Sequence, residues 1–166
     1  MIFTSIQRLW FPFFASIPTA TFFLLGFFTG PKSDDWCYGS RLKELGYFEA
    51  VKWIYTQWQG RYAANGIEQL AGYLDYLTLL AWYWLMPTTL ILAIIFSTYV
   101  LLDALNRLVL ESALRRSQVV VASIVLTSIY LVSLDRPSEV LYWLSASVSY
   151  QLANVLVTIL LATLIY

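Results

Sequence analysis

The chain has 166 residues, of which 60% are apolar and 12% charged, with no net charge and a mean hydropathy of +0.68. Soluble domains carry about 25% charged residues, so this composition excludes an ordinary soluble protein. The chain has no histidine and a single cysteine, Cys37, which excludes an internal disulfide and the commonest ligand for haem or catalytic zinc. We predict no metal site and require no cofactor, and the sequence leaves dependence on a divalent metal open.

Four runs without charged residues follow one another along the chain, at 9–31, 76–102, 117–134 and 140–166. About 20 helical residues cross the roughly 30 Å of hydrocarbon in a bilayer, so three runs are long enough and the run at 117–134 is just adequate. Inside lipid the backbone must satisfy its own hydrogen bonds, which favours helices. The sequence therefore predicts an all-α integral membrane protein, one membrane domain over 1–166, with four transmembrane helices.

A polar segment at 31–75 separates the first two runs. Within it, apolar residues recur at spacings of three and four, first at Leu42, Leu45, Phe48, Val51, Tyr55 and Trp58, and then at Ile67, Leu70, Ala71 and Leu74. One apolar face of this kind predicts an amphipathic helix over 40–58 and a shorter one after Gln59 and Gly60. Beside a bilayer, both helices are expected to lie flat at the interface.

The orientation of the chain in the membrane is predicted from the basic residues near the spans. Arg115 and Arg116 directly precede the third run and form the clearest cytoplasmic anchor under the positive-inside rule. The opposite side carries more Lys and Arg in total, six against four, but most of these lie in the long segment 31–75. Long segments cross the membrane more freely than short loops, so we predict that 31–75 is extracytoplasmic.

Two features of this segment are candidates for chemistry. Asp34 and Asp35 begin it, and each is either a helix cap or a carboxylate that acts as a base or ligand at the membrane surface. Arg61 is either an interfacial arginine that pairs with one of these aspartates or a clamp for a phosphate group.

A second polar and aromatic patch lies at the start of the fourth run, on the predicted side of the aspartate pair. Its residues are Glu139, Tyr142, Trp143, Ser145, Ser147 and Tyr150. Two such patches on one side of a membrane indicate a functional surface more strongly than either patch alone.

With these residues together, the chain resembles the N-terminal part of a GT-C-type polytopic bacterial membrane glycosyltransferase. The motifs that carry the resemblance are Asp34-Asp35-Trp36-Cys37-Tyr38, Gly46, Trp58-Gln59-Gly60-Arg61-Tyr62, and Glu139 with Tyr142-Trp143 and Tyr150. The resemblance implies a bacterial inner-membrane protein that transfers a sugar from a polyprenyl-phosphate donor at the outer face of the membrane. It also implies a catalytic role for Asp34 or Asp35. The implied substrate-binding residues are Arg61, Trp58, Tyr62, Glu139, Tyr142, Trp143 and Tyr150.

Two functions from different classes follow from the sequence. The first is the glycosyltransferase, with membrane lipid and the polyprenyl-phosphate sugar as partners and without nucleic acid. Such enzymes usually have more spans, so this interpretation makes the chain a fragment of a longer protein. The second is a small non-catalytic subunit that packs against other membrane subunits. A transporter or pore is disfavoured because no ionisable residue lies deep within a predicted span.

Overall fold

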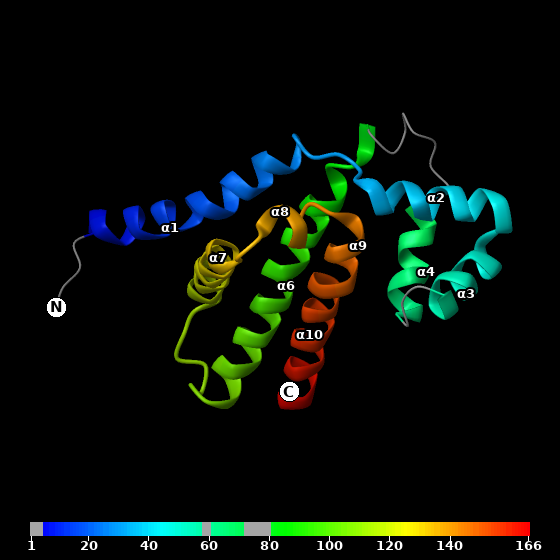
Figure 1. Ribbon diagram of the computed structural model, residues 1–166. Coiled ribbons are helices and arrows are strands. Elements are labelled where there is room, and N and C mark those ends of the chain that lie inside the picture. Colours follow the sequence, from blue (N-terminus) through cyan, green and yellow to red (C-terminus); the bar gives the residue numbers. More distant parts are fainter. Residues whose placement is uncertain (1–4, 58–60, 72–80) are drawn as a thin grey trace. The chain divides into compact units, whose positions relative to one another are not determined.

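The computed structural model describes residues 5–57, 61–71 and 81–166 (Figure 1), without the side chains of 5–9, 33, 34, 62 and 71. All regular secondary structure in these ranges is helical. The chain divides into two compact units. Unit 1 comprises Met1–Leu25, Ile91–Asp135 and Asn154–Tyr166, and unit 2 comprises Gly26–Leu90 and Arg136–Ala153.

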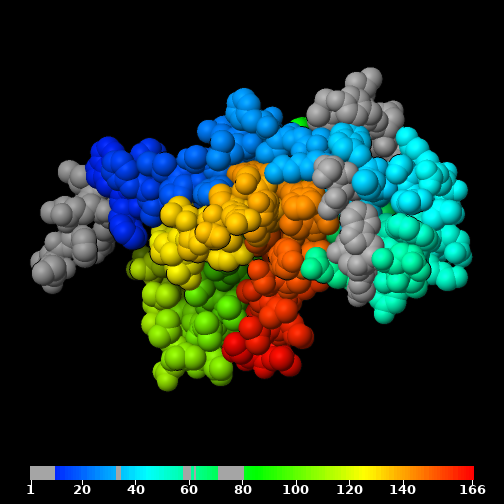
Figure 2. All heavy atoms as spheres, viewed as in Figure 1, coloured from blue at the N-terminus to red at the C-terminus, as the bar shows by residue number. Residues whose placement is uncertain are grey.

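Unit 1 is built from four long helices, of which some end residues belong to unit 2. They are α1 (Ser5–Gly26), α6 (Leu85–Leu108), α7 (Arg116–Ser133) and α10 (Ala153–Ile165). Polar contacts join them at several points. The hydroxyls of Thr19 and Ser128 lie 2.7 Å apart and link α1 to α7 in a buried position. The guanidinium of Arg107 stacks 5.1 Å from the ring centroid of Tyr166, where α6 and α10 end side by side (Figures 1 and 2).

Within the described ranges, three helical segments are long and apolar enough to cross a membrane: Leu85–Leu108, Arg116–Ser133 and Leu144–Ile165. Only 22%, 28% and 17% of the most apolar window in each is buried, as expected where lipid or other helices cover a surface. The predicted bounds 117–134 and 140–166 are close to the observed ones, whereas the predicted 76–102 begins earlier than α6, partly outside the described residues. The described apolar part of α1, Trp10–Gly26, is shorter than these three segments. The helix ends at Gly26, whereas the predicted span continues to residue 30.

Unit 2 contains shorter helices. From the predicted interfacial segment come α2 (Ser33–Leu45), α3 (Tyr47–Gln57) and α4 (Tyr62–Ala71), and all three pairs of these helices pack together. The start of the last apolar segment supplies α8 (Pro137–Val140), α9 (Leu144–Ala146) and the π-helix η1 (Ser147–Leu152). Helix α4 contacts both α9 and η1, so the two polar regions predicted from the sequence meet within one unit.

The single helix predicted over 40–58 is wrong, because the chain turns at Gly46 and forms two helices. Gly46 has φ +76° and ψ 166°, a backbone conformation that is essentially restricted to glycine. Its N–H donates to Leu42 O at 2.8 Å and closes α2. As a result the apolar stripe does not stay on one face: Leu42 and Val51 are buried, whereas Phe48 is 79% exposed.

Helix α4 presents its polar side to the interior of unit 2. Asn65, Glu68 and Gln69, at spacings of three and four, are completely buried, while Ile67 and Leu70 are 41% and 56% exposed. This arrangement reverses the pattern of a helix on a water-soluble domain, and it suits a helix whose outer face meets lipid.

Candidate functional site

The site begins at the N-terminus of α2, where Asp35 closes the first turn. The N–H of Lys32 donates to Asp35 Oδ2 at 2.9 Å, and the N–H of Asp35 donates to Lys32 O at 2.9 Å. The capping role considered for the aspartate pair is therefore present at Asp35. The cap is not solvated, however, because Asp35 is only 4% exposed.

Tyr83 connects Asp35 to the second polar region. It is 3% exposed, its hydroxyl donates to Asp35 Oδ2 at 2.8 Å, and the N–H of Leu144 donates to this hydroxyl at 3.0 Å. The same hydroxyl lies 3.4 Å from Tyr142 O. One buried phenol thus ties the start of α2 to the start of α9, two regions that are more than 100 residues apart in the sequence.

Glu68 is a second carboxyl group in this interior, and sequence reasoning missed it. Ser149 Oγ on η1 donates to Glu68 Oε1 at 3.5 Å, and the hydroxyls of Tyr38 and Ser145 also lie around the carboxyl group. Burial raises the pKa of Glu68 to about 7, the three hydroxyls lower it, and the nearby charge of Asp35 raises it further. A carboxyl group with such a pKa exchanges its proton near neutral pH, which is what an acid–base catalyst requires.

A signal in the sequence points to Glu68. Asn65, Glu68 and Gln69 share one helical face opposite the apolar stripe that predicts this helix. Beside a membrane the apolar face is directed to lipid, so the polar face is directed to protein. The polar residues opposite the apolar stripe therefore identify Glu68 as a buried carboxyl group.

The predicted substrate-binding residues fall into separate groups. Arg61 Nη2 donates to Tyr150 OH at 3.1 Å, and its guanidinium lies 5.1 Å from the centroid of the Tyr150 ring, so the structure brings these two exposed residues together. Glu139 instead pairs with Arg136, with 3.6 Å between Oε1 and Nη1. Tyr142 is 7% exposed, and its carbonyl faces Tyr83.

Trp143 is partly buried, and its carbonyl accepts hydrogen bonds from the N–H and the hydroxyl of Ser147 at the start of η1. Three other predicted site residues cannot be placed. Trp58 lies outside the described residues, as do the side chains of Asp34 and Tyr62.

An apolar pocket of about 440 Å³ lies next to this cluster in unit 2. It is lined by Ile67, Trp82, Tyr83, Leu85, Met86, Thr89, Leu90, Leu144, Ser147, Val148 and Leu152. Tyr83 belongs to both regions, because its ring lines the pocket and its hydroxyl bonds Asp35. Neither Asp35 nor Arg61 lines the pocket, so a cavity shared by these two residues stays a prediction.

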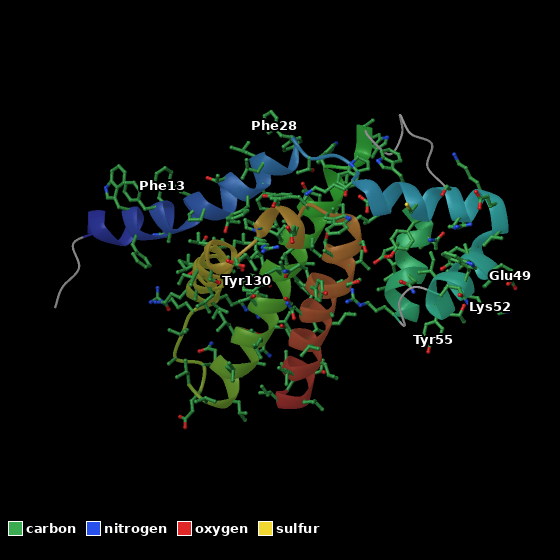
Figure 3. The ribbon with its side chains drawn as sticks, in the orientation of Figure 1. Phe13, Phe28, Glu49, Lys52, Tyr55 and Tyr130 are labelled. Carbon is green, nitrogen blue, oxygen red and sulfur yellow. The ribbon has the colours of Figure 1, made fainter. Side chains whose placement is uncertain are left out.

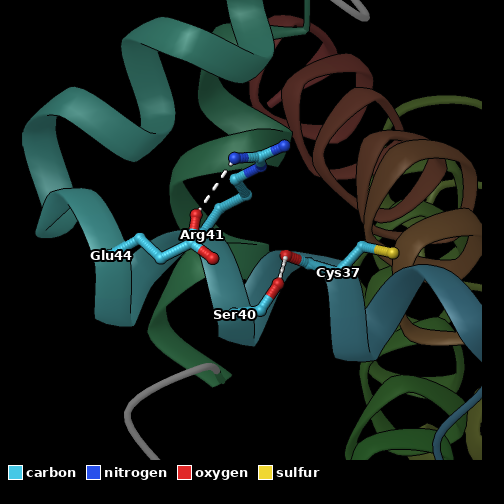
Figure 4. Close-up of polar contacts among 4 residues, drawn as sticks. All are labelled: Cys37, Ser40, Arg41 and Glu44. Atoms are coloured by element: carbon cyan, nitrogen blue, oxygen red, sulfur yellow. Dashed lines mark hydrogen bonds and ion pairs between the residues drawn. The ribbon is translucent and has the colours of Figure 1, made fainter.

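The surface of α2 beyond the site carries local pairs. Arg41 Nη1 bonds Glu44 Oε2 at 3.0 Å, and Ser40 Oγ donates to Cys37 O at 3.0 Å (Figure 4). The guanidinium of Arg41 also lies 4.3 Å from the ring centroid of Trp53, which fastens α2 to α3. Among the described residues, no group of three or more Cys, Asp or Glu side chains is placed to hold a metal ion.

Comparison with protein-family models, with curated proteins and with solved structures finds no match for this chain. The resemblance to GT-C glycosyltransferases therefore gains no support from a related sequence or fold.

Proposed function

We propose that this chain is a multi-pass membrane protein with four spans, α1 included, and that unit 2 carries an acid–base site for sugar transfer. In this proposal a carboxylate removes the proton from an acceptor hydroxyl while the hydroxyl oxygen attacks the sugar of a polyprenyl-phosphate donor. Arg61 is available to hold the phosphate, since a planar guanidinium bonds phosphate oxygens in pairs.

One observation carries this proposal: Asp35, one of the two aspartates of which either was expected to be catalytic, is withdrawn from water and placed beside a second buried carboxyl group. Asp35 is 4% and Glu68 0% exposed, and the charge of Asp35 raises the pKa of Glu68. Buried carboxyl groups are costly and are uncommon without a functional partner, and pairs whose environments separate their pKa values are typical of acid–base sites.

Replacement of Asp35 by asparagine tests the proposal. Both bonds to the Asp35 side chain that anchor α2, from Lys32 N–H and Tyr83 OH, end on one oxygen, Oδ2. An asparagine oxygen accepts the same two bonds, so Asp35→Asn removes the charge while it keeps these contacts. We expect at least a tenfold loss of sugar transfer by the full chain in lipid vesicles that contain polyprenyl-phosphate sugars, with unfolding close to that of the wild type.

Glu49→Gln is the matched control, because it also exchanges a carboxylate for an amide but at an exposed position on α3. It should leave transfer unchanged. Full transfer by the Asp35→Asn protein would overturn the proposal.

The capping bond of Asp35 favours a second function, the non-catalytic subunit. Here the buried polar groups hold unit 2 together for assembly with other membrane proteins. This alternative expects no sugar transfer by the wild type. It also expects Asp35→Asn to behave normally and Asp35→Ala, which loses both bonds, to reduce folding and assembly.

The extracytoplasmic position of 31–75 is part of the proposal and has a direct test. Ser40 is exposed on α2, so a cysteine there, in a Cys37→Ser background, should react with an impermeant thiol reagent added to intact cells (Figure 4). The Cys37→Ser protein without the new cysteine is the control. Labelling only after permeabilisation would show that this segment faces the cytoplasm.

A further inference from the structure

Two carboxyl groups share the interior of unit 2, but their hydrogen bonding differs. Asp35 Oδ2 accepts bonds from Lys32 N–H and Tyr83 OH at 2.9 and 2.8 Å, and both bonds favour the ionised form. These two donors also hold the helix start and the start of α9 in place. The Oδ2 atom of Asp35 is therefore committed to structural partners.

The hydrogen bonds named for Glu68 come from side-chain hydroxyls, those of Ser149, Tyr38 and Ser145, and not from the backbone. Glu68 Oε1 accepts from Ser149 at the long distance of 3.5 Å. Its Oε2 is fully buried and has no hydrogen-bond partner within 3.5 Å in the described part of the chain. Buried acceptors nearly always have a hydrogen-bond partner in folded proteins. This oxygen can therefore still bind a proton or accept a hydrogen bond from the hydroxyl of a ligand.

The neighbouring residue on α4 is an independent indication of a polar ligand. Gln69 is 0% exposed, and neither the nitrogen nor the oxygen of its amide has a hydrogen-bond partner among the described residues. Burial of an amide without hydrogen-bond partners costs roughly 1–3 kcal/mol of stability. We therefore expect the Gln69 amide to bind a polar ligand.

The groups around Glu68 come from three elements that pack against α4. Helix α2 supplies Asp35 and Tyr38, and α9 and η1 supply Ser145 and Ser149. From α3, Tyr47 reaches α4, where its hydroxyl donates to Gly66 O at 3.0 Å. The titratable groups around Glu68 are thus the carboxylate of Asp35 and the phenol of Tyr38, and α3 adds the phenol of Tyr47 at Gly66.

We infer that Glu68, and not Asp35, is the residue that receives the proton, while Asp35 is a positioning residue whose fixed charge acts on Glu68. The inference rests on the proposed function for its substrate. As the acceptor oxygen bonds to the sugar carbon, the carbon–oxygen bond to the phosphate breaks and the phosphate keeps the electron pair. The acceptor proton passes to Glu68 Oε2.

A spectroscopic titration of the full chain in lipid nanodiscs tests this assignment without any substrate. Infrared difference spectra follow the C=O stretch of a protonated carboxyl group as the pH is changed. We expect a band that titrates near pH 7 in the wild type and in the exposed control Glu49→Gln, and that is absent in Glu68→Gln. In Asp35→Asn the midpoint should move to lower pH, because a neighbouring negative charge has been removed.

A neutral-range band that persists in Glu68→Gln, or a midpoint that is unmoved in Asp35→Asn, would overturn the inference. Sugar transfer gives the second readout: Glu68→Gln should lose it at every pH, whereas Asp35→Asn should keep a reduced transfer whose pH profile is displaced to lower pH. Absence of sugar transfer by the wild type contradicts the proposed function alone, because the infrared titration needs no substrate. Transfer retained by Glu68→Gln contradicts the inference alone.

Discussion

Replacement of Tyr83 by phenylalanine is expected to lower the free energy of unfolding by about 3 kcal/mol. The lost hydroxyl is the donor to Asp35 Oδ2 and the acceptor of the Leu144 N–H, and all three groups are buried. Each buried group that loses its partner costs roughly 1–3 kcal/mol, and a charged group costs the most. Thermal and denaturant unfolding in detergent micelles, followed by circular dichroism, measure the change.

Tyr55→Phe is the matched control for this effect. Tyr55 lies on α3 and is 47% exposed, with its side chain directed outward (Figure 3). Removal of its hydroxyl should change stability by less than about 0.5 kcal/mol. If Tyr83→Phe is as stable as Tyr55→Phe, the phenol does not hold α2 and α9 together as described.

Glu68 should make the protein less stable as the pH rises through neutrality. In the folded protein its pKa is about 7, whereas the ordinary value is 4.5. Between these values the folded chain holds a proton that the unfolded chain has released, so raising the pH favours unfolding. The contribution is complete below about pH 4.5 and is lost as the pH passes 7, with a total change of about 3 kcal/mol.

Comparison of the wild type with Glu68→Gln isolates this contribution from other titrating groups. Glutamine is neutral throughout, so the difference in unfolding free energy between the two proteins should shrink or reverse from pH 5 to pH 8. The exposed control Glu49→Gln should follow the wild type. A constant difference across this range would show that Glu68 has an ordinary pKa in the folded state.

Three of the four predicted apolar helices are long enough to cross a membrane in the described part of the chain, because length and absence of charge are local properties. Arg116–Ser133 differs by one residue at each end from the predicted run. The break at Gly46 was missed, because the spacing of apolar residues continues through it while the backbone turns. Helical periodicity does not report a single positive φ angle.

The site was only partly predictable, for a physical reason. Asp35 and Tyr142 were selected as polar or aromatic residues near the membrane, and the structure links them through Tyr83. Tyr83 itself lay inside a predicted span and was not among the predicted site residues. Its role depends on a contact with Leu144, 61 residues away, and such pairings are not encoded in any local pattern.

The π-helix η1 sets the helical phase of the last apolar segment. An α-helix turns each residue by about 100°, and a π turn, which closes from i to i+5, shifts the residues after it by about one position. Within six residues this shift lets Ser149 reach Glu68, Tyr150 meet Arg61, and Val148 line the apolar pocket. Removal of one residue from η1 would restore a regular α-helix, with the segments before and after η1 in nearly the same helical phase but with the residues between them in changed positions. The three contacts could then no longer be made together, although the hydropathy of the segment would hardly change.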